Sequence, residues 1–273
     1  MPCGIGWFRR TLALKSAMGR IHLFEWEDLS WFPKNLRDYG TDFLEFLAQK
    51  TGLFQPAVPV LSKALKRLET NQIIDLASGG GGALPGLNKE LQKEVPGLQI
   101  TLSDYYPNLS AFKRISNEHA NIAFKAEAVD ARAVPQELKG LRTQFLSLHH
   151  FKPKDARAIL QNAVDSGQGI AVFEGQERSI PSVLAMVFSP ISLLLSTPFI
   201  RPFRWGRLLF TYLIPIVPLF VLWDGVVSSL RTYSVAEMKE LIASLRDADH
   251  FEWEVAKVKS GPAKVLYLVG LPK

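Results

Sequence analysis

The chain has 273 residues, 47% of them hydrophobic, and a formal net charge of +6 at pH 7. This length suits one large α/β domain with attachments and argues against two independent catalytic domains. The single cysteine, Cys3, excludes an internal disulfide framework and predicts a reducing, cytoplasmic compartment. The excess positive charge lies in residues 1–20 and 181–223, which contain no acid, so the nearly neutral remainder predicts no nucleic-acid-binding groove.

Two attachments precede the predicted main domain. Residues 1–20 form a basic extension without a long apolar run, and Met18 is an alternative start within it. The basic residues of this extension are Arg9, Arg10, Lys15 and Arg20. Residues 21–56 carry apolar side chains at helical spacing and are predicted to form a helical cap. The main domain is expected to span 57–273 and to open with a helix.

An apolar run that ends in an acid and opens onto four glycines occupies residues 73–82. This pattern predicts a strand, a tight turn and a helix start, which can hold a nucleotide-like ligand because glycine permits positive φ and close approach to the main chain. A second strand-like run, 98–103, ends at Asp104, whose carboxylate can accept hydrogen bonds from ribose hydroxyls. A dinucleotide site favours G-x-G-x-x-G, whereas here Asp75 stands four residues before Gly79.

The turn, with Asp75, Ala77, Gly79 and Gly81 at alternate positions, resembles the D-x-G-x-G-x-G signature of class I S-adenosylmethionine-dependent methyltransferases, with Ala77 replacing the first glycine. A ribose acid, an acid for the adenine amino group and a fourth strand at 145–151 follow in the family's order. The resemblance implies a Rossmann-like, doubly wound, seven-stranded, mostly parallel α/β sheet and S-adenosyl-L-methionine as cofactor. The cofactor-binding residues that it implies are Asp75, Ala77, Ser78, Gly79, Gly81, Asp104, Tyr105, Asp130, Ala131 and Leu148. The alternative is a nucleotide fold that uses another ligand or none.

Methyl transfer to a protonated acceptor needs a base, and the candidates after the predicted fourth strand are His149 and His150. Because side chains alternate along an extended segment, only one of the two is expected to point into the site. The alternative for either is a structural histidine bonded to the main chain. Weaker candidates for the base are His22, Glu25, Asp28, Glu174 and Glu177. No Cys/His cluster in the sequence suggests a metal.

The rest of the chain predicts two helices, a fifth strand and a closing antiparallel hairpin. The predicted elements are a helix over 153–164, a strand over 169–174, a helix over 235–245 capped by Ser234, and hairpin strands over 251–258 and 264–269. The family's fold needs only a short loop after its fifth strand, so the apolar residues 181–223 are an insertion there.

This insertion contains prolines at 190, 198, 215 and 218, and each half is too short or too broken to cross a bilayer. We expect an interfacial or re-entrant hairpin at an anionic membrane surface. The arginines expected to reach the headgroups are Arg201, Arg204 and Arg207. The alternative is a soluble lid or a homo-oligomer interface that buries the same surface, and RNA contact through the neighbouring aromatic residues is a third interpretation.

These features predict S-adenosylmethionine-dependent methylation of a lipophilic small molecule at the surface of the cytoplasmic membrane, with no nucleic-acid partner. One alternative is a soluble small-molecule methyltransferase whose insertion is a lid or a dimer interface. Another is a catalytically silent S-adenosylmethionine-binding subunit that anchors a partner enzyme through its apolar insertion.

Overall fold

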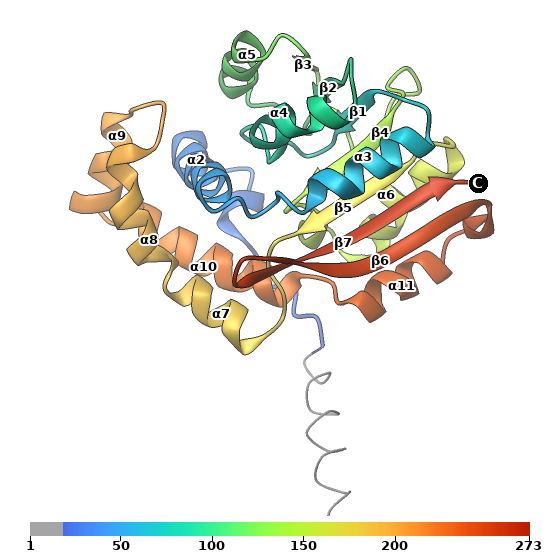
Figure 1. Cartoon of the computed structure of the whole chain (residues 1–273). Helices are drawn as coiled ribbons and strands as arrows, with labels where there is room; N and C mark the ends of the chain where they lie inside the picture. Colours follow the sequence, from blue (N-terminus) through green and yellow to red (C-terminus); the bar gives the residue numbers. More distant parts are fainter. Residues whose placement is uncertain (1–18) are drawn as a thin grey trace, which may run out of the picture.

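The computed structural model describes residues 19–273 and contains one seven-stranded sheet with the strand order β3-β2-β1-β4-β5-β7-β6 (Figure 1). The five strands β3, β2, β1, β4 and β5 are parallel, and β7 pairs antiparallel with both β5 and β6. The strands are β1 (Gln72–Asp75), β2 (Gln99–Leu102), β3 (Ile122–Phe124), β4 (Leu141–Phe145), β5 (Ile170–Glu174), β6 (Phe251–Ser260) and β7 (Ala263–Pro272). The predicted seven-stranded, mostly parallel sheet is confirmed.

Helices cover both faces of the sheet. The helices are α2 (Lys34–Thr51), α3 (Ala57–Arg67), α4 (Leu84–Glu94), α5 (Leu109–Glu118), α6 (Pro153–Asp165), α7 (Ile180–Val187), α8 (Ser189–Ser196), α9 (Trp205–Leu208), α10 (Ile216–Arg231) and α11 (Val235–Ala243). One apolar core joins α3, α4 and α5 to the sheet, and a second joins α6 and α11 to the opposite face. Neighbouring residues of β1 divide between them, Ile73 in the first core and Ile74 in the second, because strand side chains alternate.

Two expected boundaries are wrong. The fourth strand ends at Phe145 rather than running to 151, and its inward-facing Arg142 and Gln144 hid it from an apolar pattern, since both are buried. The helix after β2 begins at Leu109, where the Asn108 side chain accepts a hydrogen bond from the main chain of the first turn, so Pro107 lies outside it.

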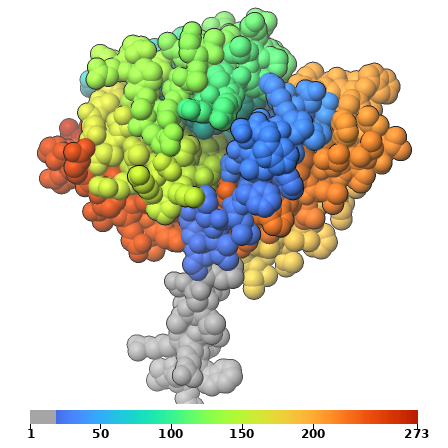
Figure 2. Space-filling model, turned by 180° about the vertical axis from the view of Figure 1, so that it is seen from behind, coloured from blue at the N-terminus to red at the C-terminus, as the bar shows by residue number. Residues whose placement is uncertain are grey.

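The predicted cap region contains the short 3-10 turn η2 (Trp26–Asp28) and helix α2. Figure 2 shows this blue segment between the orange helices that follow β5 and the rest of the sheet domain. Most of the predicted basic extension, with Cys3 and Met18, lies outside the described residues.

Helices α7 to α10 form what we call the apolar arm, residues 180–231. A third apolar core joins α8 and α10 of the arm to α2. Large hydrophobic side chains of the arm remain more than half exposed: Ile180, Phe188, Leu195, Phe199, Trp205, Leu213 and Leu219. The predicted end of the insertion at Trp223 lies inside α10, and Pro218 lies in the first turn of that helix, where a missing N–H is tolerated, rather than breaking it.

Within residues 19–273, no individual helix has the length and apolar composition to cross a membrane. Two bent helix pairs satisfy those criteria jointly, Ile180–Val187 with Ser189–Phe199 at 40° and Trp205–Leu213 with Ile216–Arg231 at 80°.

The arginines of the arm do not behave as the sequence predicts. Arg207 is 1% exposed and pairs with Asp42 of α2 at 2.6 Å, and its Nη2 also donates to the main-chain oxygen of Ile200 at 2.9 Å. Arg204 lies 3.6 Å from Asp42. The expectation that Arg207 reaches lipid headgroups is therefore wrong, because an acid far away in the sequence buries it, and Arg201 alone of the three is exposed.

Candidate active site

The chain reverses sharply between β1 and α4. Ala77, Gly79 and Gly81 take positive φ angles of 57°, 55° and 125°. A Cβ at Gly81 would come within 2.2 Å of Ile115 Cδ1, whereas one at Gly79 would meet no atom within 4 Å. Glycine is therefore required at 81, and Gly79 leaves main chain that a ligand can approach. Ala77, the departure from the family signature, holds its Cβ in a strained left-handed conformation.

Asp75 lies beneath this turn. Its carboxylate accepts hydrogen bonds from Thr143 Oγ1 at 2.6 Å and from Ser78 Oγ at 2.7 Å, and the residue is 1% exposed. Burial raises the pKa of Asp75 to about 7, although the two hydroxyl donors offset part of the effect. The side chains of Asp75 and Ser78 thus fix the shape of the turn, and neither reaches a surface open to ligand.

Asp104 follows β2 and lies against the same turn. Its Oδ2 accepts the Gly79 N–H and its Oδ1 accepts the Tyr106 N–H, both at 2.8 Å. Tyr105 is 50% exposed, with its ring 4.9 Å from that of Tyr106. Asp104, Tyr105 and Gly79 therefore meet at the carboxyl edge of the parallel strands, where open α/β sheets bind ligands.

The predicted adenine-side residues lie in the loop between β3 and β4. The Asp130 carboxylate pairs with Arg132 at 2.8 Å, and this hydrogen bond lowers the pKa of Asp130. Two further predicted residues are buried in the second apolar core: Ala131 and Leu148. Their side chains support the site from below rather than facing a ligand.

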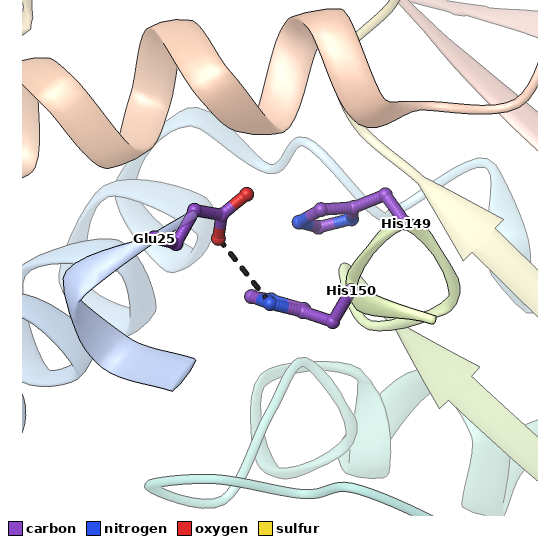
Figure 3. Close-up of side chains that lie close together, drawn as sticks. All are labelled: Glu25, His149 and His150. Carbon is purple, nitrogen blue, oxygen red and sulfur yellow. Dashed lines mark ion pairs between the residues drawn. The ribbon is translucent and has the colours of Figure 1, made fainter. Parts of the chain in front are cut away.

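His149 and His150 face the same space from the 3-10 turn η3 (Leu148–His150), which follows β4 (Figure 3). Their ring centroids are 4.2 Å apart. The expectation that only one of them points into the site is wrong, because a 3-10 turn rotates about 120° per residue and an extended segment about 180°.

His149 is held by an acid from the neighbouring strand. Its Nδ1 lies 2.8 Å from Glu174 Oε2, and its main-chain N–H donates to Glu174 Oε1 at 3.1 Å. Glu174 ends β5 and is fully buried, while His149 is 2% exposed. When Nδ1–H is donated to this carboxylate, Nε2 of the neutral ring is the free acceptor. The pair is therefore a base oriented by a buried acid.

His150 meets acids from the N-terminal segment. Its Nδ1 lies 2.9 Å from Asp28 Oδ1 and 3.2 Å from Glu25 Oε2. Burial alone would lower the pKa of His150, but the carboxylates of Glu25 and Asp28 outweigh burial and raise it to about 10. His150 is thus an imidazolium at neutral pH and not a base. The other weak candidates also lie apart from this role: Glu177 pairs with Lys257, and burial lowers the pKa of His22 to about 4.

Glu25 completes a cluster that the sequence did not predict. One ligand atom from each of Glu25, His149 and His150 lies within 4.8 Å of the others, so the three could hold a divalent metal ion. Arg231 Nη1 lies 3.1 Å from Glu25 Oε1 and supplies positive charge to the same cluster. No local signal could have revealed the cluster, because its members are far apart in the chain.

Comparison with known proteins places the fold. No protein-family model and no curated protein sequence matches the chain. Among solved structures it is similar to human N-acetylserotonin methyltransferase in complex with S-adenosylmethionine, at 16% identity over 99% of this chain and 68% of that one, with a TM-score of 0.51. It also matches an O-methyltransferase family protein from Burkholderia thailandensis (17% identity, 82% and 57% of the chains, TM-score 0.47). A third match is the methyltransferase domain of bacterial CtHen1-CN (14%, 79% and 98%, 0.48).

The strand order and the similarity to the human enzyme show that this chain has the class I S-adenosylmethionine-dependent methyltransferase fold. It spans little more than half the length of the Burkholderia protein, 57%. At these identities the likeness extends to the fold, so ligand and activity must be argued from the site itself.

Proposed function

We propose that the protein transfers a methyl group from S-adenosyl-L-methionine to a small molecule, and the observation that carries this proposal is the buried pair of His149 and Glu174. The pair lies at the ends of β4 and β5, on the edge of the sheet that also carries the glycine turn. The bound cofactor would supply an electrophilic methyl group, which leaves positioning, exclusion of water and proton removal to the protein.

The residues that would hold the cofactor are those with free polar groups at this edge. Asp104 would accept the ribose hydroxyls, because each of its oxygens has one main-chain donor and can accept another. The open space beside Gly79 favours close approach of a ligand to the turn. Tyr105 would lie against the adenine or ribose, and Asp130 would accept the adenine amino group in competition with Arg132.

His149 would take the proton of the acceptor at Nε2. Glu174 would keep the ring in that orientation and stabilise the imidazolium that forms, so we assign it a positioning role. General-base catalysis of this kind contributes about 10²–10⁴-fold to the rate.

We further propose that the substrate is lipophilic and is reached from the cytoplasmic membrane surface, with residues 21–56 as a cap and 181–223 as a membrane-contacting insertion. The exposed apolar side chains of the arm support this proposal. The face also lacks negative charge, since residues 179–223 contain no acid. If the arm is instead a lid or a dimer interface, the substrate need not be a lipid. If the protein is a silent subunit, it binds the cofactor without methyl transfer.

The test is methyl transfer from labelled S-adenosylmethionine into a cell lipid extract, with the mass of the product identifying the acceptor. Wild-type protein should label a product and His149→Ala should not, while Glu174→Asp, which keeps a carboxylate, should recover part of the activity that Glu174→Ala loses. Cofactor binding without any labelled product in lipid or aqueous extracts would favour the silent subunit.

A further inference from the structure

The segment Arg20–Asp28, which we call the strap, is built inside out. Its outward side chains are apolar, with Ile21, Leu23 and Phe24 exposed by 43%, 42% and 47%. Its inward side chain Glu25 is 1% exposed and lies against the two histidines (Figure 3). A loop that faces only water would place these groups the other way round, so the outer side of the strap fits an apolar partner.

The strap covers the proposed base. Arg20 Nη2 donates to the main-chain oxygen of His149 at 2.7 Å, and Glu25 closes the space in front of the rings. His149 is consequently only 2% exposed. Two cavities found in residues 19–273, of about 240 and 180 Å³, are lined by other residues and do not reach it. A substrate can meet His149 Nε2 only after the strap moves.

Polar contacts, most of them to α10, hold the strap in place. The Ile21 N–H donates to the Leu230 oxygen at 3.2 Å, and Arg231 Nη1 pairs with Asp28 at 2.6 Å. Further contacts are Arg231 Nε to the Leu23 oxygen at 2.7 Å, Trp223 Nε1 to the Phe24 oxygen at 2.9 Å, and the Trp26 and Glu27 N–H groups to Asp224 at 2.8 and 3.1 Å. Water or lipid headgroups can replace polar contacts of this kind, so the strap can open without exposing an apolar core.

The strap and the arm present one continuous apolar surface. The Phe24 ring lies 5.3 Å from that of Trp223 on α10, which joins the strap to the exposed side chains of the arm. The exposed Arg201 and the absence of acids between 179 and 223 complement acidic lipid headgroups. A bilayer that binds the arm would therefore also contact the strap.

We propose that the strap is a lid over the histidine pair and that contact with a bilayer bearing acidic headgroups opens it. The proposal rests on the function proposed above and adds regulation: the site is closed in water and open at a lipid surface.

Hydrogen–deuterium exchange of the full chain tests the lid without relying on catalysis. Mixed phosphatidylcholine and phosphatidylglycerol vesicles should speed exchange of the Ile21, Trp26 and Glu27 amides about tenfold or more in sedimented protein. Asp28→Asn, which weakens the contacts to Arg231 and His150, should speed the same exchange without vesicles. Asp249→Asn, an exposed acid far from the strap, is the matched control and should not.

Two serine substitutions separate docking from opening. Leu213→Ser on the arm should reduce sedimentation with vesicles, whereas Phe24→Ser should sediment normally and lose the faster strap exchange. Unchanged strap exchange in wild-type protein that sediments would overturn the lid, and so would a protein that stays in the supernatant, including as a soluble dimer with a protected strap. Strap opening without methyl transfer would leave the lid standing and refute the enzyme proposal.

Discussion

Replacing Asp104 with alanine is expected to weaken binding of S-adenosylhomocysteine by about tenfold to a hundredfold. Each oxygen of Asp104 accepts one main-chain N–H at 2.8 Å, from Gly79 or from Tyr106, and keeps a lone pair for a ribose hydroxyl. A hydrogen bond to a charged group contributes about 1.5–3 kcal/mol. Since about 1.4 kcal/mol corresponds to a factor of ten, losing the carboxylate gives the stated range.

Two further variants calibrate this effect. Asp104→Asn keeps one acceptor oxygen and should lose less affinity than Asp104→Ala. Asp130→Ala should lose still less, under about tenfold, because Arg132 already occupies that carboxylate.

Isothermal titration calorimetry on each variant is the measurement, with circular dichroism to show that the variant is folded. If the folded Asp104→Ala protein binds S-adenosylhomocysteine as tightly as wild type, the carboxylate does not face the ribose and the ligand position is wrong.

Four other expectations concern the base, the arm and pH. His149→Ala should lose about a hundredfold or more in turnover with cofactor affinity retained, and His150→Ala should lose less; near-native rates in both would leave positioning as the sole catalytic device. Arg207→Met leaves Asp42 with Arg204 3.6 Å away and should lower the free energy of unfolding in urea by about 3 kcal/mol; a loss under about 1 kcal/mol would contradict the buried pair. Burial raises the pKa of Asp224 to about 7, and despite burial Glu25 and Asp28 raise that of His150 to about 10. The folded protein then binds more protons than the unfolded chain, so the free energy of unfolding should fall from about pH 5 to about pH 9, and a rising curve would refute the shifts. The protein should sediment with acidic vesicles, with Arg201→Gln weakening binding by only about 1 kcal/mol and Leu195→Ser with Leu219→Ser weakening it further; protein that stays in the supernatant at low salt would make the arm an interface.

Local patterns in the sequence were sufficient where one segment determines its own structure. The glycine turn, the acid after β2 and the closing hairpin depend on short-range rules of backbone freedom and alternation, and the structure has each of them close to the expected residues. The capping box of Ser234 with Glu237 at the start of α11 is another such case.

Contacts between distant segments could not be read in the same way. Arg207 looks like a surface cation until Asp42 is placed beside it, and His150 looks like a base until Glu25 and Asp28 surround it. In both cases the partner comes from the N-terminal segment, whose position over the sheet depends on tertiary packing rather than on local periodicity.

The strained alanine in the glycine turn bears on how related chains should be sought. Relative to glycine, Ala77 costs about 1–2 kcal/mol in the folded state because its φ is 57°. Glycine at this position would in turn enlarge the unfolded ensemble, an entropy difference of about 0.4–1 kcal/mol in favour of alanine. The two terms largely cancel, so the exchange changes overall stability little while leaving a stiffer turn. A signature written only in glycines passes over such chains, and the backbone shape of the turn is the better criterion for finding them.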